Sequence, residues 1–154
     1  VVARGNPRGI SGLSDLAGPD ISIVNRPLST GTRLWFDRKL NECGLTPTSL
    51  TGYDRELQRH LDVGLEVLAG RADAGPAIRV VADLLDLDFI PMHWERFDLL
   101  IAKTTFFDKN VQSFLSLLTD PSFQDMASNY TGYDLSKCGK IIYPSAADPV
   151  STTK

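Results

Sequence analysis

Short apolar runs alternate with stretches of helical periodicity along this 154-residue chain, and that alternation constrains its fold more than any other feature. The apolar runs predict strands at residues 1–3, 21–24, 50–53, 72–78, 88–92 and 97–102. The spacing of apolar residues predicts helices at residues 31–43, 59–69, 79–85, 110–118 and 121–127. Strands that alternate with helices are typical of βαβ units. The predicted fold class is therefore α/β, with a mostly parallel sheet flanked by helices.

The turn NRPLSTGTR, residues 25–33, lies where such a sheet binds ligands, because it joins a predicted strand to a predicted helix. Unpaired backbone N–H groups and the helix dipole make a helix N-terminus attractive to anions. Hydroxyl groups can donate hydrogen bonds to the anion, a glycine lets it approach the backbone, and an arginine supplies charge. The residues of this candidate oxyanion site are Ser29, Thr30, Gly31, Thr32, Arg33 and Arg26. The alternative is an ordinary helix N-cap, in which a hydroxyl satisfies one N–H.

Two further residues are candidate ligand contacts at the same edge of the predicted sheet. Arg55 follows the predicted strand at residues 50–53, and His60 lies near the start of the next helix. They would then face the same cleft as the first turn. The simpler interpretation, which the residues favour, is a solvated charged loop with a capping histidine. Trp94, in the connection between two later strands, is either a stacking platform or a half-buried anchor.

The sequence contains few groups suited to catalysis, and no metal or cofactor site is predicted. His60 and His93 lie in different loops, and neither is beside a nucleophile elbow. An HExxH motif, an EF-hand loop and a Cys/His cluster are all missing from the sequence. Cys43 and Cys138 are far apart, and two idle thiols are favoured over a disulfide. The chain is therefore predicted not to be an enzyme.

Net charge and hydropathy restrict the class of partner. The formal net charge is −3, which does not suit a nucleic-acid-binding face but allows a local positive turn that holds a small anion. No apolar run reaches the roughly 18 residues of a membrane span. The first ten residues lack the layout of a signal peptide.

Several stretches together resemble the periplasmic-binding-protein-like domain, a type II solute-binding fold related to molybdate- and tungstate-binding proteins. The matching stretches, in chain order, are GNPRGISGLSDLAG (5–18), ISIVNRPLSTGTRLWFD (21–37), GYDRE (52–56), LAGRADAG (68–75), LDFIPMHWERFDLLI (87–101) and GYDLSKCGKI (132–141). Near the first turn, the family pattern has a Gly-Ser-Gly-Thr-Arg-like turn after Asn-Arg. This chain keeps Gly31, Thr32 and Arg33 but has Ser29 and Thr30 where Gly-Ser is common.

The resemblance implies a two-lobed fold of which this chain holds the C-terminal portion. Residues 1–18 would be a hinge strand and connector, and residues 19–92 a complete second lobe. Residues 93–143 would supply the return strand and C-terminal helices of an incomplete first lobe, and residues 144–154 a flexible tail. The remaining part of the first lobe would precede Val1. Exposed apolar surface would then be covered by a partner or by a second copy in a homodimer.

The resemblance also implies a function. The chain is expected to be a non-catalytic ligand-binding module for a small oxyanion, with molybdate or tungstate first, in uptake or sensing. One alternative is the effector-binding domain of a transcription regulator or a molybdopterin-biosynthesis fusion that recognises an organic anion. Another is a domain that serves mainly for dimerisation. Expected partners are a fused DNA-binding or biosynthetic domain, which implies the cytoplasm, or an ABC transporter, which implies a periplasmic or extracellular receptor; the sequence leaves this open.

Overall fold

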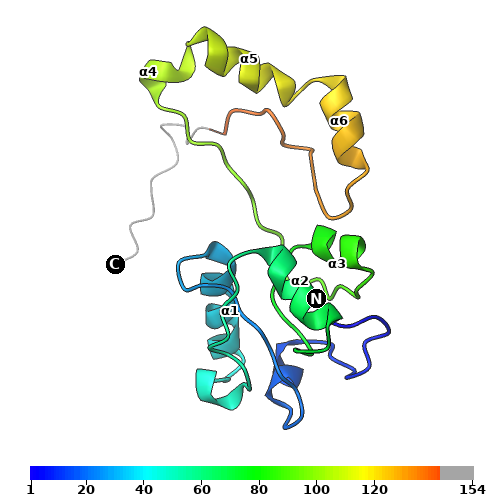
Figure 1. Cartoon of the computed structure of the whole chain (residues 1–154). Coiled ribbons are helices and arrows are strands. Elements are labelled where there is room, and N and C mark those ends of the chain that lie inside the picture. The colour runs from blue at the N-terminus through cyan, green and yellow to red at the C-terminus, as the bar shows by residue number, and fades with distance from the viewer. Residues whose placement is uncertain (143–154) are drawn as a thin grey trace. The chain divides into compact units, whose positions relative to one another are not determined.

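The computed structural model describes residues 1–142 as two units, one from Val1 to Arg96 and one that begins at Phe97. The helices of the first unit are η1 (Leu13–Ala17), α1 (Gly31–Glu42), η2 (Pro47–Ser49), α2 (His60–Leu68) and α3 (Arg79–Leu85), of which η1 and η2 are short 3-10 helices (Figure 1). Those of the second unit are α4 (Lys103–Phe106), α5 (Lys109–Leu117) and α6 (Pro121–Ser128). The predicted tail, residues 144–154, lies outside the described residues.

All five predicted helices are present, and each bound lies within one residue of its prediction. The signals that set them are local. Thr30 caps α1 by accepting a hydrogen bond from the backbone N–H of Arg33. The buried residues of α1 are Arg33, Phe36 and Leu40, whose spacing places them on one face of the helix. An arginine therefore occupies a core-facing position of α1.

The predicted parallel sheet is wrong, because no strand or sheet forms within residues 1–142. The extended segments touch only through isolated bridges. Three of these are parallel, Ser22–Thr51, Ile23–Ala74 and Asn25–Glu56, and two are antiparallel, Val2–Ala74 and Val2–Asp88. The predicted fold class is thus corrected: the first unit has helices around a layer of extended segments that lack a continuous ladder.

Two local features explain why the bridges do not extend into a ladder. Gly52 has a φ of 86°, and the turn there brings the N–H of Arg55 to the carbonyl of Gly52 at 2.9 Å. This turn interrupts the segment that pairs with residues 22–25. On the other side, the Asp73 carboxylate accepts hydrogen bonds from both the backbone N–H and the hydroxyl of Ser22. A side chain thus takes a donor that a ladder would use.

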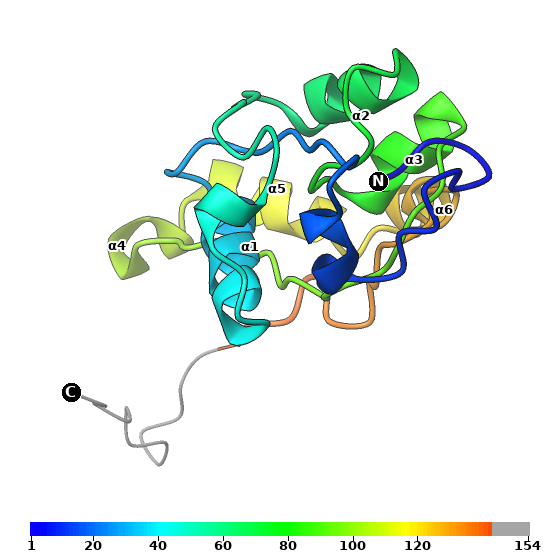
Figure 2. The ribbon, with the colours of Figure 1, turned by 90° about the horizontal axis from the view of Figure 1, so that it is seen from below.

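The layer of extended segments lies between two apolar clusters. Ile23 and Val24 are consecutive and almost fully buried, and they point to opposite sides because side chains alternate along extended backbone. Ile23 belongs to the cluster that includes buried residues of η1 and α1, and Val24 to the cluster that includes residues of α2 and α3. Figure 2 shows η1, in blue, beside α1, while α2 and α3 pack on each other. The layer therefore orders the segments whose ends form the candidate site.

The second unit differs from the first because none of its helices contains a buried residue. The strand predicted at residues 97–102 is also wrong. Phe97 is 93% exposed and Leu100 is 100% exposed, and the described residues offer this segment no bridge partner. Extended backbone without a neighbouring strand cannot form a ladder. The four-residue helix α4 was not predicted. The lobe assignments made from the sequence stay predictions.

Candidate functional site

Two segments of the first unit end side by side, and each leads into a helix. Asn25 forms a parallel bridge with Glu56, and the backbone N–H of Leu57 donates to the carbonyl of Asn25 at 2.9 Å. Beyond this pair, α1 begins at Gly31 and α2 at His60. The N-termini of both helices therefore follow the same edge, which is where the sequence placed its candidate residues.

Arg33 lies inside this edge and is enclosed by groups of the protein itself. It is 2% exposed, and its Nε donates to both carboxylate oxygens of Asp37 at 2.9 Å. Its Nη1 donates to Glu56 Oε1 at 3.0 Å and to the carbonyl of Arg26 at 2.9 Å. The guanidinium also lies 4.4 Å from the centre of the Tyr53 ring. These contacts use hydrogen-bond donors and charge of Arg33, the residue that the sequence analysis predicted to balance the charge of a bound anion.

Electrostatics keep Arg33 charged in this position. Burial lowers its pKa, but hydrogen bonds and charge interactions with Tyr53 and Asp37 outweigh burial and raise the pKa above its ordinary value. The Tyr53 hydroxyl donates to Asp37 Oδ1 at 2.8 Å. Arg33, Asp37 and Tyr53 thus form one internal network.

Arg26 is also buried, at 7% exposed, but its hydrogen bonding is incomplete. Nη1 donates to the carbonyl of Leu57 at 2.9 Å, whereas Nε is buried and has no hydrogen-bond partner. Burial lowers the pKa of Arg26, and the charge of Asp62 acts in the opposite direction. An arginine remains a cation at neutral pH even so. The edge therefore holds a buried positive charge with one unused donor.

His60 opens α2 close to Arg26, and one of its nitrogens also has no partner. The imidazole Nδ1 is buried and makes no hydrogen bond. Burial, and then the positive charge of Arg26, lower the pKa of His60, while a hydrogen bond with the backbone of Pro76 acts in the opposite direction. The neutral form of His60 is therefore favoured. The structure thus brings together two predicted site residues, Arg26 and His60, that come from different segments.

The small residues of the turn have different surroundings. The Thr30 hydroxyl donates to the carbonyl of Pro27 at 2.8 Å and accepts from the N–H of Arg33, so it serves as the cap. Ser29 is exposed and Thr32 is partly exposed, and neither hydroxyl has a hydrogen-bond partner among the described residues. Gly31 is exposed at the first position of α1.

A later segment lies along α1 and was not predicted to do so. A Cβ built at Gly31 would lie 3.0 Å from Glu95 Oε1, so a carboxylate lies against the start of α1. The ring of His93 stacks on Trp35, with ring centres 5.3 Å apart. The Trp35 Nε1 is buried without a hydrogen-bond partner, whereas Trp94 is 70% exposed. No spacing in the sequence indicates these contacts, because they join residues from separate elements.

Arg55 forms its hydrogen bonds with Arg71 and Glu66, and not with Arg26 or His60. Its Nη1 donates to the carbonyl of Arg71 at 2.8 Å, and its Nη2 donates to Glu66 Oε2 at 2.9 Å. Glu66 also accepts from Arg71 at 2.7 Å. Arg55 is therefore part of an exposed ion-pair cluster at the C-terminal half of α2.

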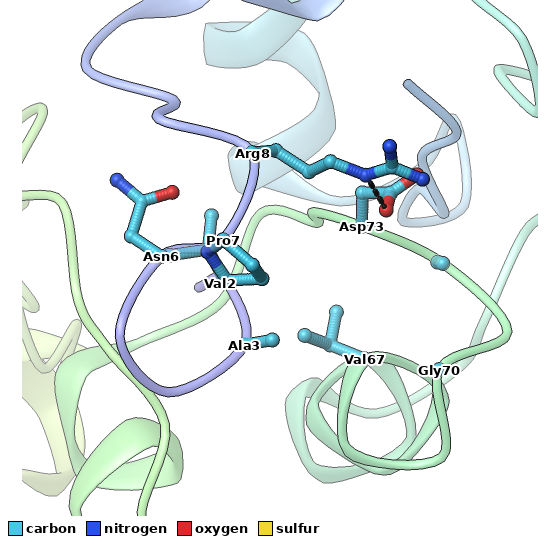
Figure 3. Close-up of a pocket in the computed structure, with 9 residues that line it drawn as sticks. Val2, Ala3, Asn6, Pro7, Arg8, Val67, Gly70 and Asp73 are labelled. Atoms are coloured by element: carbon cyan, nitrogen blue, oxygen red, sulfur yellow. Dashed lines mark hydrogen bonds and ion pairs between the residues drawn. The ribbon is translucent and has the colours of Figure 1, made fainter. Parts of the chain in front are cut away.

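A hollow of about 270 Å³ lies elsewhere in the first unit (Figure 3). Its lining residues are Val2, Ala3, Asn6, Pro7, Arg8, Val67, Gly70, Ala72 and Asp73. Ala3 and Val67 point toward each other across it, and Arg8 pairs with Asp73 at 2.8 Å. None of the predicted site residues lines this hollow. With its only charged groups paired to each other, it offers an anion no free charge.

Residues 1–142 contain no group of three or more side chains that could hold a metal ion. In that part of the chain, no helix is both long and apolar enough to cross a membrane. Cys43 and Cys138 are both free thiols.

Comparison with known proteins identifies the family. Residues 1–119 match the family model of the PBP superfamily domain, and the chain therefore belongs to this periplasmic-binding-protein-like superfamily.

Two curated proteins are similar to the chain. The uncharacterised protein YvgK of Bacillus subtilis (strain 168) is 30% identical over 141 residues, which cover 92% of this chain and 45% of YvgK. An uncharacterised protein in the ferredoxin 2Fe-2S gene 5′ region of Clostridium pasteurianum is 32% identical over 108 residues, which cover 70% of this chain and 96% of that protein. The chain thus spans less than half the length of YvgK. No solved structure gives a significant match.

Proposed function

We propose that this chain is a non-catalytic ligand-binding module for a small oxyanion, with molybdate and tungstate first, that acts in uptake or sensing. Membership of the PBP superfamily supports a ligand-binding role. The observation that carries the anion assignment is Arg26, a buried cation whose Nε has no partner. The site would lie at the edge where the segments before α1 and α2 end.

The energetics of Arg26 favour an external partner. Leaving a buried donor unsatisfied costs about 1–3 kcal/mol, and more for a charged group. Buried polar groups in proteins are nearly always satisfied, so an exception needs a physical explanation. An oxyanion would supply both an acceptor for Nε and a compensating charge. The N-terminus of the nine-residue helix α2 adds partial positive charge beside it.

The proposal changes the roles first assigned from the sequence. Arg26 becomes the main counter-charge, and His60 lies next to it. Arg33 acts as a positioning residue, because its Nη1 holds the carbonyl of Arg26. The hydroxyls of Ser29 and Thr32 remain donors for the oxyanion, while Thr30 caps α1.

Three further assignments remain part of the proposal. Gly31 would permit close approach to α1, whereas Arg55 would not contact the ligand because its cation is paired with Glu66. The chain would be the C-terminal portion of a type II protein, and the rest of the first lobe would close over the site.

One observation favours a second candidate, an organic anion bound by an effector domain of a regulator or a biosynthetic fusion. Trp35 is stacked on His93, and its indole N–H is buried without a partner. An indole N–H needs an acceptor when buried. A planar carboxylate or a pterin phosphate would provide a flat face for the aromatic rings and an acceptor for the indole N–H of Trp35.

Calorimetric titration of the full chain with molybdate, tungstate, sulfate and phosphate tests the proposal. We expect at least one oxyanion to bind more tightly than millimolar, and Arg26→Gln to weaken that binding at least tenfold. Arg38→Gln is the matched control, because Arg38 is an exposed residue of α1 paired with Glu42 at 3.3 Å. Binding that is millimolar or weaker for all four anions, or equal in Arg26→Gln and the wild type, contradicts the proposal.

A further inference from the structure

We propose that His60 couples oxyanion binding at Arg26 to the uptake of one proton, so that the site takes a dianion and a proton together. This inference rests on the proposed oxyanion site. It adds a form of regulation, because the affinity for the anion then depends on pH near neutrality.

The geometry that carries the inference is a pair of unused nitrogens from two separate elements. Arg26 Nε and His60 Nδ1 are both buried, and both are without a hydrogen-bond partner. They come from the segment before α1 and from the first residue of α2, whose preceding segments meet at the Asn25–Glu56 bridge. The two side chains are close enough for the charge of Arg26 to act on the imidazole. A buried arginine whose Nε lacks a hydrogen-bond partner is an independent reason to place a ligand at the start of α2.

The charged groups around His60 determine what an anion would do. From α2, Asp62 pairs with Arg59 at 2.7 Å, and it also attracts Arg26. From the segment after Ala74, the backbone of Pro76 forms a hydrogen bond with the ring. From α3, which packs on α2, the charged groups are Arg79 and Asp83, 3.9 Å apart and partly exposed.

Arg26 is therefore the charge that most affects His60 in the free protein. Burial, and then the charge of Arg26, favour the neutral imidazole. A dianion bound to Arg26 would reverse the sign of the local charge. Opposite charge within a few ångströms favours the protonated form of histidine.

The proton balance is simple and involves no covalent step. Neutral imidazole takes one proton from solvent and becomes imidazolium, which carries N–H donors at both ring nitrogens. Nδ1 then donates to an oxygen of the anion, as Arg26 Nε does. The site would thus supply two donors and two positive charges to a dianion, which is electrically balanced. At a pH above the pKa of bound His60, the second donor is lost.

Calorimetry of the full chain with sulfate and with molybdate in two buffers of different ionisation enthalpy measures the proton uptake directly. At pH 7.5 we expect a net uptake of up to one proton per anion. The dissociation constant should rise about tenfold per pH unit between the pKa of free His60 and that of the anion complex. Sulfate is the decisive probe, because it takes up no proton itself in this range. Equal binding enthalpy in both buffers would overturn the inference.

Two variants separate the effect of proton uptake by His60 from a change in the structure of the site. His60→Asn retains a polar side chain that does not titrate, and we expect its binding of sulfate to be independent of pH and free of proton uptake. His93→Asn is the control, since His93 stacks on Trp35 and is expected to keep the wild-type pH dependence. Wild-type proton uptake in His60→Asn would assign the proton to another group and overturn the inference.

A spectroscopic measurement does not depend on the variant folding. We expect an NMR titration of the His60 ring in the wild type to show a higher pKa with saturating sulfate than without it. An unchanged pKa overturns the inference but leaves the oxyanion site standing. If none of molybdate, tungstate, sulfate and phosphate binds the wild type at any pH, both the inference and the proposed function fail.

Discussion

Arg33 donates a hydrogen bond from Nη1 to the backbone carbonyl of Arg26 at 2.9 Å, so one buried arginine fixes the backbone of another. The two side chains then differ in what remains of their hydrogen-bonding capacity. Arg33 is occupied by Asp37, Glu56 and Tyr53, whereas Arg26 keeps an unpartnered Nε. This contrast separates a residue that stabilises the fold from one that is available to a ligand, and mutations can test it.

Arg33→Met is expected to destabilise the protein by about 3 kcal/mol, because it removes the cation that pairs with the Asp37 carboxylate and leaves the carbonyl of Arg26 without its Arg33 donor. The loss of the cation over the Tyr53 ring adds to this. Urea unfolding followed by circular dichroism measures the change. Arg38→Met on the exposed face of the same helix should stay within about 0.5 kcal/mol of the wild type. Equal stability of the two variants would contradict the structural role of Arg33.

Arg26→Met should behave in the opposite way. It removes a buried cation with an unsatisfied donor and loses one hydrogen bond to Leu57, so we expect unfolding free energy to change by less than about 1 kcal/mol. Oxyanion binding, however, should be lost. Unfolding curves are measured without sulfate and with sulfate at about 50 times its dissociation constant. The first gives the change in stability, and the difference between them reports binding, because a bound ligand stabilises the native state. Retained stabilisation by sulfate in Arg26→Met would place the anion elsewhere.

The sequence predicted the helices well because their signals are local. Thr30 caps α1 as a residue of its type does, and apolar periodicity marks the other helices. The prediction of a sheet was wrong because strand pairing depends on long-range contacts. The turn at Gly52 and the side-chain bonds from Ser22 to Asp73 depend on how distant segments meet, and apolar runs carry no information on that.

The position of the turn at residues 25–33 directly before α1 was predictable, but the contacts of its side chains were not. Its place between a strand-like segment and α1 follows from the pattern of elements. The different surroundings of Arg26 and Arg33 do not, because Glu56 and Tyr53 reach Arg33 only in the folded chain. The approach of Glu95 to α1 likewise requires the tertiary structure.

The lowered pKa of His60 predicts a loss of stability in mild acid. Unfolded histidine has a pKa of about 6.5. Since the folded pKa lies below this, the unfolded state binds the proton first, and the free energy of unfolding falls as pH decreases from about 6.5 toward the folded pKa. The folded pKa of carboxylates such as Asp73 is also lowered. Their protonation reduces stability only at more acidic pH, because an unfolded aspartate has a pKa of about 3.9. Urea unfolding at pH 7.5 and 5.5 should show the loss in wild type and His93→Gln and show less in His60→Gln. Equal losses in both variants would assign the effect to other groups.

Gly52 is predicted to be the glycine of the first unit that least tolerates a side chain. A Cβ there would lie 2.2 Å from the carbonyl oxygen of Ile23, and its φ is 86°. Gly70 has a similar φ of 67° but nothing within 4 Å of a built Cβ, which makes it the matched control. We expect Gly70→Ala to cost about 1 kcal/mol for the left-handed backbone, and Gly52→Ala to cost about 1–3 kcal/mol more for the clash. Thermal unfolding of the two variants compares them, and equal midpoints would show that the Gly52 turn opens at little cost.

Glu95 offers a test of whether an anion approaches the start of α1. Its carboxylate lies against Gly31, where it repels a bound anion and competes for the unpaired N–H groups of the helix. Glu95→Gln removes the charge and keeps the shape, and we expect it to tighten sulfate binding about two- to fivefold. Glu42→Gln, at the opposite end of α1, is the control and should leave affinity unchanged. The gain in Glu95→Gln should shrink as salt rises, since exposed charges are screened over about 10 Å at 0.1 M. Unchanged affinity in Glu95→Gln at low salt would mean that the anion contacts Arg26 and α2 without reaching α1.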